Sequence, residues 1–505
     1  MNMFSNARNS HIILLVIIAV AGLLFRLCYS PYNVPLSLDG LLYFWYATDT
    51  STLGHLPQGY TFPNNLWPLF VSPFFYMIKS NNFLDLMYLQ RLLSISISIL
   101  TIIPVYFLCR RFFDKQYALI GVILFVFEPR IIQNSTLGLT EPLFILFGTA
   151  TLVLFFSDKI RYVYLSFAIL ALFSLTKYEG LLLIIPITIM HFVRFGKNRQ
   201  SIKKYLLALS IFILVITPVA YSRIQITGKD GLTSHILGGA NVVSSEIIDN
   251  EQVAKKFSIT TGLVTFSKLI GWSTIPLFIL FIPFGIYTIF KKRNYMNYSI
   301  IFIGAVFLIP ALYAYSRGIE EIRYLFIIFP LFSLISLFTI KTIIEKSKQK
   351  KPIIIILIVG IALSSVLFVN WKINNEHELE AVKIAEEVAK RTTLINDYHP
   401  ESVYLRTVGF ADYQDFRGKH DIIHNKIKVL YAEKFSSLKE FLNYAKEQKL
   451  EFLIADDQSS RPEFIRDVLY HEEKYPFLTK EYDSSQDGLK YYVKIFRINY
   501  NLIEQ

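Results

Sequence analysis

Acidic residues recur in the short gaps between the long apolar runs of this chain. Asp39 comes shortly after the first apolar run, residues 11–30, and Glu141 and Glu179 stand in later gaps. A carboxylate held at a membrane edge costs free energy unless it is paired or used. The chemistry that suits Asp39 is general-base catalysis, in which it takes a proton from an attacking hydroxyl.

Cationic side chains accompany these carboxylates. Arg91 stands in "YLQRLLS", Lys177 in "LTKYEGLLL", and Arg323 with Tyr324 in "SRGIEEIRYLF". Arginine at a membrane edge can bind an anion such as a phosphate. Carboxylates and cations on one face suit a donor that is both a lipid and a phosphate, because the cations would stabilise the charge that develops on the departing phosphate. Sugar transfer from a polyprenyl phosphate has these needs.

Each motif taken alone also has an interpretation without chemistry. Asp39 can cap an interfacial helix whose aromatic residues follow it, and Glu141 stands in a Thr-Glu-Pro sequence typical of a helix start. Lys177 and Glu179 can pair within a turn, Arg91 can extend to the interface, and residues 317–324 can form a cluster of ion pairs. The coincidence of the motifs on one face favours the functional interpretation.

Composition and hydropathy predict a polytopic membrane protein. The hydrophobic fraction is 53% and the mean hydropathy is +0.42. About eleven apolar runs are long enough to span a bilayer, which takes roughly 20 apolar residues. The run 66–78 is too short and contains two prolines, so we expect it to lie at the interface. The expected spans begin near His11, Met87, Tyr117, Thr140, Ile160, Leu181, Tyr205, Leu263, Tyr298, Arg323 and Pro352.

Lysine and arginine set the expected orientation. They gather in alternate loops, which places the N-terminus in the cytoplasm of a multi-pass plasma-membrane protein and the C-terminal domain outside it. The net charge of +12 therefore reflects topology and contact with anionic lipids, not nucleic-acid binding. The two cysteines, Cys28 and Cys109, are expected on opposite sides and form neither a disulfide framework nor a zinc motif.

Two domains are expected. Residues 1–371 form the membrane domain, with a first outer loop at 31–85 and a second at 223–262, which contains His235 and could act as a lid. Residues 372–505 form a soluble α/β domain. Its predicted helices cover about 376–395, 437–448 and 462–470, and its predicted strands 402–408, 428–431, 451–455 and 490–498.

The order of motifs over about residues 10–340 resembles that of integral-membrane glycosyltransferases with the C-type fold. The likeness is to the protein O-mannosyltransferase superfamily, which includes the aminoarabinose transferase that modifies lipid A. It rests on Asp39, on "YTFPNNLWPLFVSPFFY", on Arg91 in "RLLSISISIL", and on "STLGLTEPLF", whereas "TKYEGLLLIIP" and "IRYLFIIFPLF" look most like archaeal members.

This resemblance implies an inverting transfer of a sugar, such as mannose, from a polyprenyl- or dolichyl-phosphate carrier to a glycan, lipid or protein. It implies that Asp39 is the catalytic base, that Glu141 is the second acidic loop residue, and that Arg91 lies near the donor phosphate. The resemblance also implies that Lys177, Glu179 and Arg323 belong to the site. Many relatives have Asp-Glu in the first loop, but here Gly40 follows Asp39.

Two other functions remain open from the sequence. A transporter or flippase of lipid-linked glycans is the main alternative, but transporters usually carry internal repeats and charges near mid-span. A receptor-like scaffold would leave the clustered carboxylates without a role. No cofactor is expected, although a divalent ion between Asp39 and Glu141 is compatible with the residues.

Overall fold

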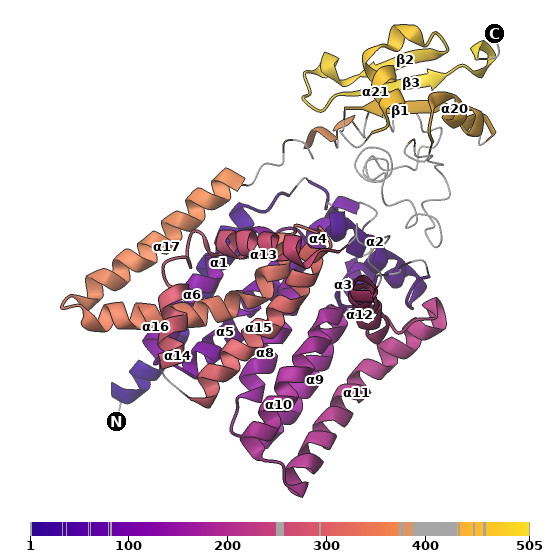
Figure 1. Ribbon diagram of the computed structural model, residues 1–505. Helices are drawn as coiled ribbons and strands as arrows, with labels where there is room; N and C mark the ends of the chain where they lie inside the picture. The colour runs from indigo at the N-terminus through magenta and orange to yellow at the C-terminus, as the bar shows by residue number, and fades with distance from the viewer. Residues whose placement is uncertain are drawn as a thin grey trace.

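The membrane domain is a bundle of helices, described here from a computed structural model (Figure 1). The structure describes residues 3–503 except 249–256, 388–431 and shorter gaps at 33, 37, 59, 61, 79, 81–82, 292–293, 373–375, 377–378, 382, 385–386, 433–434, 448–449 and 458–460. The bundle helices are α1 (Met3–Cys28), α4 (Phe83–Leu100), α5 (Ile102–Arg110), α6 (Lys115–Val126), α7 (Pro129–Ser135), α8 (Glu141–Phe155), α9 (Ile160–Thr176), α10 (Ile184–Phe195), α11 (Arg199–Thr227), α13 (Ile259–Thr274), α14 (Ile282–Lys291), α15 (Tyr295–Ser316), α16 (Phe329–Lys346) and α17 (Lys350–Lys372).

The helical membrane fold is confirmed, but the number of long spans is smaller than predicted. Among the described residues, seven helices are long and apolar enough to cross a membrane, or eight if the bent pair α6 and α7 is one span. The predicted spans near Thr140 and Ile160 fall on α8 and α9, which have 15 and 17 residues. Such helices are only about 23–26 Å long, shorter than the hydrocarbon layer. The sidedness of the termini stays a prediction.

Burial separates the centre of the bundle from its rim. In the span that contains α16, 83% of the most apolar stretch is buried, compared with 11% for α1 and α11 and 17% for α17. The exposed residues on the three rim helices are mostly apolar, as expected for surfaces that face lipid. Side chains carried by α8, α9, α15 and α16 therefore meet in the interior of the bundle.

Two short helices of the first outer loop lie at one end of the bundle: α2 (Leu38–Leu53) and α3 (Leu66–Ile78) (Figure 1). The prediction that residues 66–78 form a separate short segment matches α3. Gly40 lets α2 begin directly against the turn at Leu137, because a Cβ at this position would lie 2.5 Å from the Leu137 carbonyl oxygen. Gln90 donates to the carbonyls of Gly40, at 2.9 Å, and Gly138, at 2.8 Å. These contacts fix the position of Asp39.

Arg91 is bonded to backbone oxygens of the first outer loop. Its Nε donates to the Thr136 carbonyl at 2.6 Å, and its Nη1 donates to the carbonyls of Pro31 and Val34 at 2.6 and 3.2 Å. Only 2% of its surface is exposed. This geometry gives Arg91 a structural role, and its predicted role at the donor phosphate has no support from these contacts.

The predicted outer loop 223–262 is largely helical where the structure describes it, and its sidedness and its role as a lid stay predictions. Helix α11 continues to Thr227, and α12 spans Thr233–Ile248. Asp230 accepts hydrogen bonds from the backbone N–H groups of Thr233 and Ser234, at 2.9 and 3.0 Å. This N-terminal cap, together with the positive φ of Gly231, starts the helix.

The C-terminal domain packs a small antiparallel sheet on two helices (Figure 1). The sheet order is β1-β3-β2, and the predicted elements at 437–448, 451–455, 462–470 and 490–498 are confirmed. Strand β2 was missed because its charged residues hide the apolar alternation of an edge strand. The predicted strands at 402–408 and 428–431 lie outside the described residues. The elements are α20 (Leu438–Glu447), β1 (Phe452–Asp456), α21 (Glu463–Tyr470), β2 (Leu478–Asp483) and β3 (Val493–Ile498).

Replacing Arg91 should mainly affect stability. We expect Arg91→Ala to destabilise the protein by about 3 kcal/mol, because it leaves buried carbonyl oxygens without donors. Arg91→Lys should recover only part of this loss, since one ammonium group cannot reproduce the guanidinium fork. Thermal unfolding in detergent measures the effect, with exposed Arg317→Ala as the control. Unchanged stability in Arg91→Ala would contradict the structural role.

Burial raises the pKa of Asp49 in α2 to about 6, although the Tyr60 hydroxyl that bonds to this carboxylate lowers it in part. Between about pH 4 and pH 6 the folded protein holds a proton that the unfolded chain has lost, so stability falls as pH rises through this window. Asp49→Asn should remove this decrease, which is about 2–3 kcal/mol. Thermal unfolding at pH 4.5 and pH 7.5 checks this, and an identical pH dependence in Asp49→Asn and wild type would contradict it.

Candidate active site

Two ion pairs lie at the end of the bundle that the first outer loop covers. The Asp39 carboxylate on α2 contacts Arg323 Nη1 at 2.6 Å, and the same guanidinium contacts Glu321 through Nε at 3.5 Å. The side chains of Asp39 and Arg323 are 34% and 23% exposed, so this pair is reachable from solvent. Arg323 thus joins the outer loop to the bundle.

The second pair lies deeper. Lys177 Nζ donates to Glu141 Oε1 at 3.1 Å, and the two side chains are 11% and 3% exposed. The ammonium group also lies over the rings of Tyr324 and Phe144, 5.4 and 5.8 Å from their centroids. A buried pair in this setting is held by mutual attraction, and neither charge is tolerated without the other.

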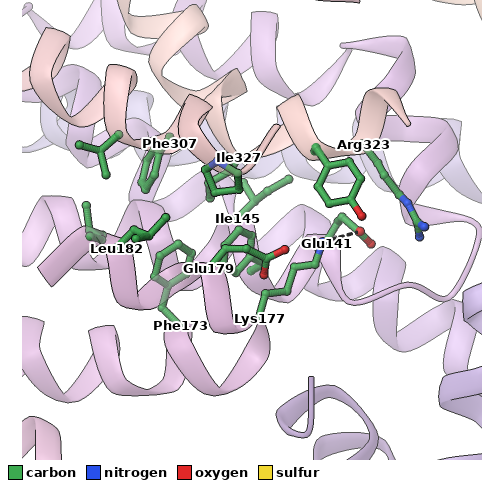
Figure 2. A pocket seen from close by; sticks show the side chains of 14 residues that line it. Glu141, Ile145, Phe173, Lys177, Glu179, Leu182, Phe307, Arg323 and Ile327 are labelled. Carbon is green, nitrogen blue, oxygen red and sulfur yellow. Dashed lines mark hydrogen bonds and ion pairs between the residues drawn. The ribbon is translucent and has the colours of Figure 1, made fainter. Parts of the chain in front are cut away.

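Glu141, Lys177 and Arg323 line one pocket, which has a polar end and an apolar end (Figure 2). Figure 2 shows the side chains of Lys177, Glu141 and Glu179 close together, with Arg323 beyond Glu141. Leu182 and Phe307 lie at the other end. The remaining lining residues are Phe144, Ile145, Phe173, Leu183, Val306, Pro310, Tyr324 and Ile327. Such a pocket suits an amphipathic ligand with a charged head and an apolar tail.

Interruptions in the helices position the polar side chains. Glu141 stands in the first turn of α8, followed by a proline. After α9 the backbone of Lys177 is extended, and the 3-10 helix η1 (Tyr178–Leu183) begins. A Cβ on Gly180 would lie 2.9 Å from the Ser174 Cα, so a glycine lets η1 pack on α9. Likewise, the 3-10 helix η2 (Ile322–Ile328) precedes α16 and carries Arg323.

The structure brings most of the predicted site residues together. Glu141, Lys177, Glu179, Arg323 and Tyr324 line the pocket, and Asp39 joins them through Arg323. Their catalytic and binding roles stay predictions. His235 on α12 contacts the ring of Tyr178, with centroids 5.4 Å apart, and does not line the pocket. Arg91 lies outside the pocket as well.

Tyr43 was treated in the sequence only as part of an aromatic belt. Burial and then the charges of Asp39 and Glu141 raise the pKa of its hydroxyl well above the ordinary value. This hydroxyl accepts a hydrogen bond from Asn64 Nδ2 at 3.0 Å. The spacing of four residues between Asp39 and Tyr43, which places both on one face of a helix, was the available signal.

The side chains around Asp39 and Glu141 do not favour the predicted alternative of a divalent ion between them. Each carboxylate faces a cationic side chain, Arg323 or Lys177. Among the residues that the structure describes, no three metal-ligating side chains gather into a group. The arrangement favours an anion that shares these cations over a metal ion that would have to displace them.

Comparison with known proteins finds relatives of this chain in sequence and in fold. A family model described as dolichyl-phosphate-mannose-protein mannosyltransferase matches residues 69–221, which include Glu141 and Lys177. No curated protein sequence matches the chain at a significant level.

Solved structures share the fold at low sequence identity. The archaeal oligosaccharyltransferase AglB from Archaeoglobus fulgidus, in complex with an inhibitory peptide and a dolichol-phosphate, has a TM-score of 0.58 at 13% identity over 89% of this chain and 70% of that one. The structure of the Archaeoglobus fulgidus oligosaccharyltransferase with Zn and sulfate has a TM-score of 0.54 at 15% identity over 78% of this chain. There the chain spans 57% of the other protein's length.

ArnT from Cupriavidus metallidurans in the apo state is similar over nearly its whole length. Its TM-score is 0.56 at 11% identity, and the match covers 97% of this chain and 98% of that one. These likenesses establish the architecture, and the family model adds a sequence match over part of the membrane domain. The chain therefore shares the fold of AglB and ArnT, and residues 69–221 match the mannosyltransferase family model.

Proposed function

We propose that this protein transfers a sugar from a polyprenyl- or dolichyl-phosphate carrier to a hydroxyl group of a glycan, lipid or protein. The observation that carries the proposal is the Asp39–Arg323 ion pair at the polar end of a pocket whose other end is apolar. A base, a cation and an apolar cavity are the three groups that such a donor requires.

The two ends of the pocket would bind different parts of the donor. Lys177 and Arg323 would hold the phosphate, because their side chains come from separate segments and approach one polar space. The apolar end, with Leu182 and Phe307, would take the first part of the polyprenyl chain. AglB has been solved with a dolichol-phosphate, which agrees with a lipid-phosphate ligand for this fold.

The reaction would proceed as a single displacement with inversion. The acceptor oxygen attacks the anomeric carbon, and the bond between this carbon and the phosphate oxygen breaks. Asp39 takes the acceptor's proton, and the polyprenyl phosphate leaves with the bonding electron pair. Lys177 and Arg323 stabilise the negative charge that grows on the phosphate, which lowers the barrier.

Arg323 would connect donor binding to the base. In the structure its guanidinium is bonded to Asp39, so this carboxylate is occupied by the ion pair. A donor phosphate competes for the same guanidinium, so binding of the donor would free Asp39 to accept a proton. Tyr43, which stands one helical turn from Asp39, would orient the acceptor hydroxyl or the phosphate.

Several parts of this proposal come from the resemblance and the family description. The family name makes mannose, or a similar hexose, the first sugar to test. We place the reaction at the outer face of the membrane, since the charge distribution in the loops puts the first outer loop there. The C-terminal domain would then face the same compartment as the acceptor.

Asp39→Asn should abolish transfer while the fold stays intact. A lost general base lowers the rate by about 100- to 10,000-fold. The assay follows radiolabelled sugar from polyprenyl-phosphate mannose, and then from other hexoses, into acceptors in purified membranes. Exposed Asp85→Asn is the matched control. Transfer at the wild-type rate in Asp39→Asn would rule out this base, and transport of the donor without transfer by the wild type would favour a flippase.

Lys177→Met should destabilise the protein by about 3–5 kcal/mol, because it leaves the buried Glu141 carboxylate without a counter-charge. The double variant Lys177→Met/Glu141→Gln should recover most of this stability but not donor binding. Lys177→Arg keeps the cation and serves as the control. Thermal unfolding and binding of polyprenyl phosphate are measured in parallel, and full donor binding by the double variant would contradict the role of Lys177.

A further inference from the structure

Two carboxylate oxygens in the pocket lack hydrogen-bond donors among the described residues. Glu141 Oε1 is bonded to Lys177, but Glu141 Oε2 is buried and has no donor. Glu179 Oε2 is likewise buried and without a donor. Glu141 is 2% exposed as a whole residue, and both side chains line the same pocket. A buried acceptor left without a donor is unfavourable, so these oxygens are suited to a ligand that supplies hydrogen.

The parts of a lipid-phosphate sugar differ in what they can offer to these oxygens. A carboxylate only accepts hydrogen bonds. The phosphate carries negative charge and would be repelled, and the polyprenyl chain has no polar hydrogen. The hydroxyl groups of the sugar ring are the remaining donors, and a hydroxyl bonded to a carboxylate makes a strong, charge-assisted hydrogen bond.

The positions of the charged groups agree with this division. Lys177 is bonded to Glu141, and these two side chains and that of Glu179 line the same pocket (Figure 2). Arg323 lies beyond Glu141, next to Asp39 (Figure 2). A phosphate held by Lys177 and Arg323 would therefore place the attached sugar beside the two glutamates, where their free oxygens can reach its hydroxyls.

We propose that Glu141 and Glu179 recognise the transferred sugar by accepting hydrogen bonds from two of its hydroxyl groups. The substrate class is thus a neutral hexosyl group with free hydroxyls at two positions. A uronosyl group, whose own carboxylate would face two glutamates, is excluded by charge repulsion. This inference rests on the proposed function, because it assigns the donor's sugar to the same pocket.

The test compares donor binding by full-length wild type, Glu179→Ala, Glu179→Gln and the control Glu320→Ala, all in nanodiscs. Glu320 is an acid at the same end of the bundle whose side chain is 57% exposed and outside the pocket. The ligands are a polyprenyl-phosphate hexose, its series of monodeoxy analogues, and the corresponding polyprenyl-phosphate uronic acid. Dissociation constants are measured for each pair of protein and ligand.

For the wild type and Glu320→Ala we expect two of the deoxy analogues to bind more weakly than the parent hexose, by about tenfold or more. Each of these two analogues loses one hydrogen bond to a charged group. In Glu179→Ala one of these penalties should disappear. In Glu179→Gln, which preserves the shape of the side chain, the uronic acid donor should gain affinity relative to the hexose.

Equal penalties for every deoxy analogue in wild type and Glu179→Ala would overturn the assignment of Glu179, even if the wild type transfers sugar. A penalty that disappears as expected, in a protein that never transfers sugar, would support the recognition site and count against the proposed transfer. The two failures are therefore distinguishable.

Discussion

The contact between Asp39 and Arg323 is the interaction on which the rest of the site depends. It joins a helix of the first outer loop to the 3-10 turn that precedes α16, a largely buried helix of the bundle. Arg323 also contacts Glu321, so its guanidinium lies between two carboxylates. The pair therefore ties the loop to the bundle through a residue that lines the pocket, and in the proposed mechanism it breaks when a phosphate takes the guanidinium.

The polar end of the pocket is built where regular helix stops. Glu141 begins a helix, Lys177 stands in extended backbone between a helix and a 3-10 turn, and Arg323 lies within such a turn. Side chains at these breaks can point into the interior, whereas those on continuous helices face neighbouring helices or lipid. The apolar lining comes from α8, α9, α15 and the two 3-10 helices, so one pocket has both characters.

The sequence can indicate which charged residues lie together because charge is rare in an apolar chain. Asp39, Glu141, Lys177, Glu179 and Arg323 stand out from their surroundings, and the structure gathers them. The same reasoning assigns Arg91 to the site. A sequence cannot distinguish a guanidinium that binds an anion from one that bonds to backbone carbonyls, as Arg91 does. That distinction needs the positions of residues 31–34 and 136, which are remote in sequence.

Other features depend on tertiary structure in the same way. The helix at 233–248 was missed because it contains the poor helix formers Gly238 and Gly239, although the Asp230 cap was visible. The length of a span also depends on context: α8 and α9 are too short to cross a bilayer as straight helices, yet their apolar sequences look like complete spans. The unsatisfied oxygens of Glu141 and Glu179 could be found only once the pocket was known.

The measurement that tests the central claim most directly is a structure of the protein bound to a polyprenyl-phosphate hexose. The account predicts that the phosphate lies between Lys177 and Arg323, that the contact between Arg323 and Asp39 is broken, and that the freed Asp39 carboxylate faces the anomeric carbon. A phosphate bound elsewhere, with the Asp39–Arg323 ion pair intact, would contradict it.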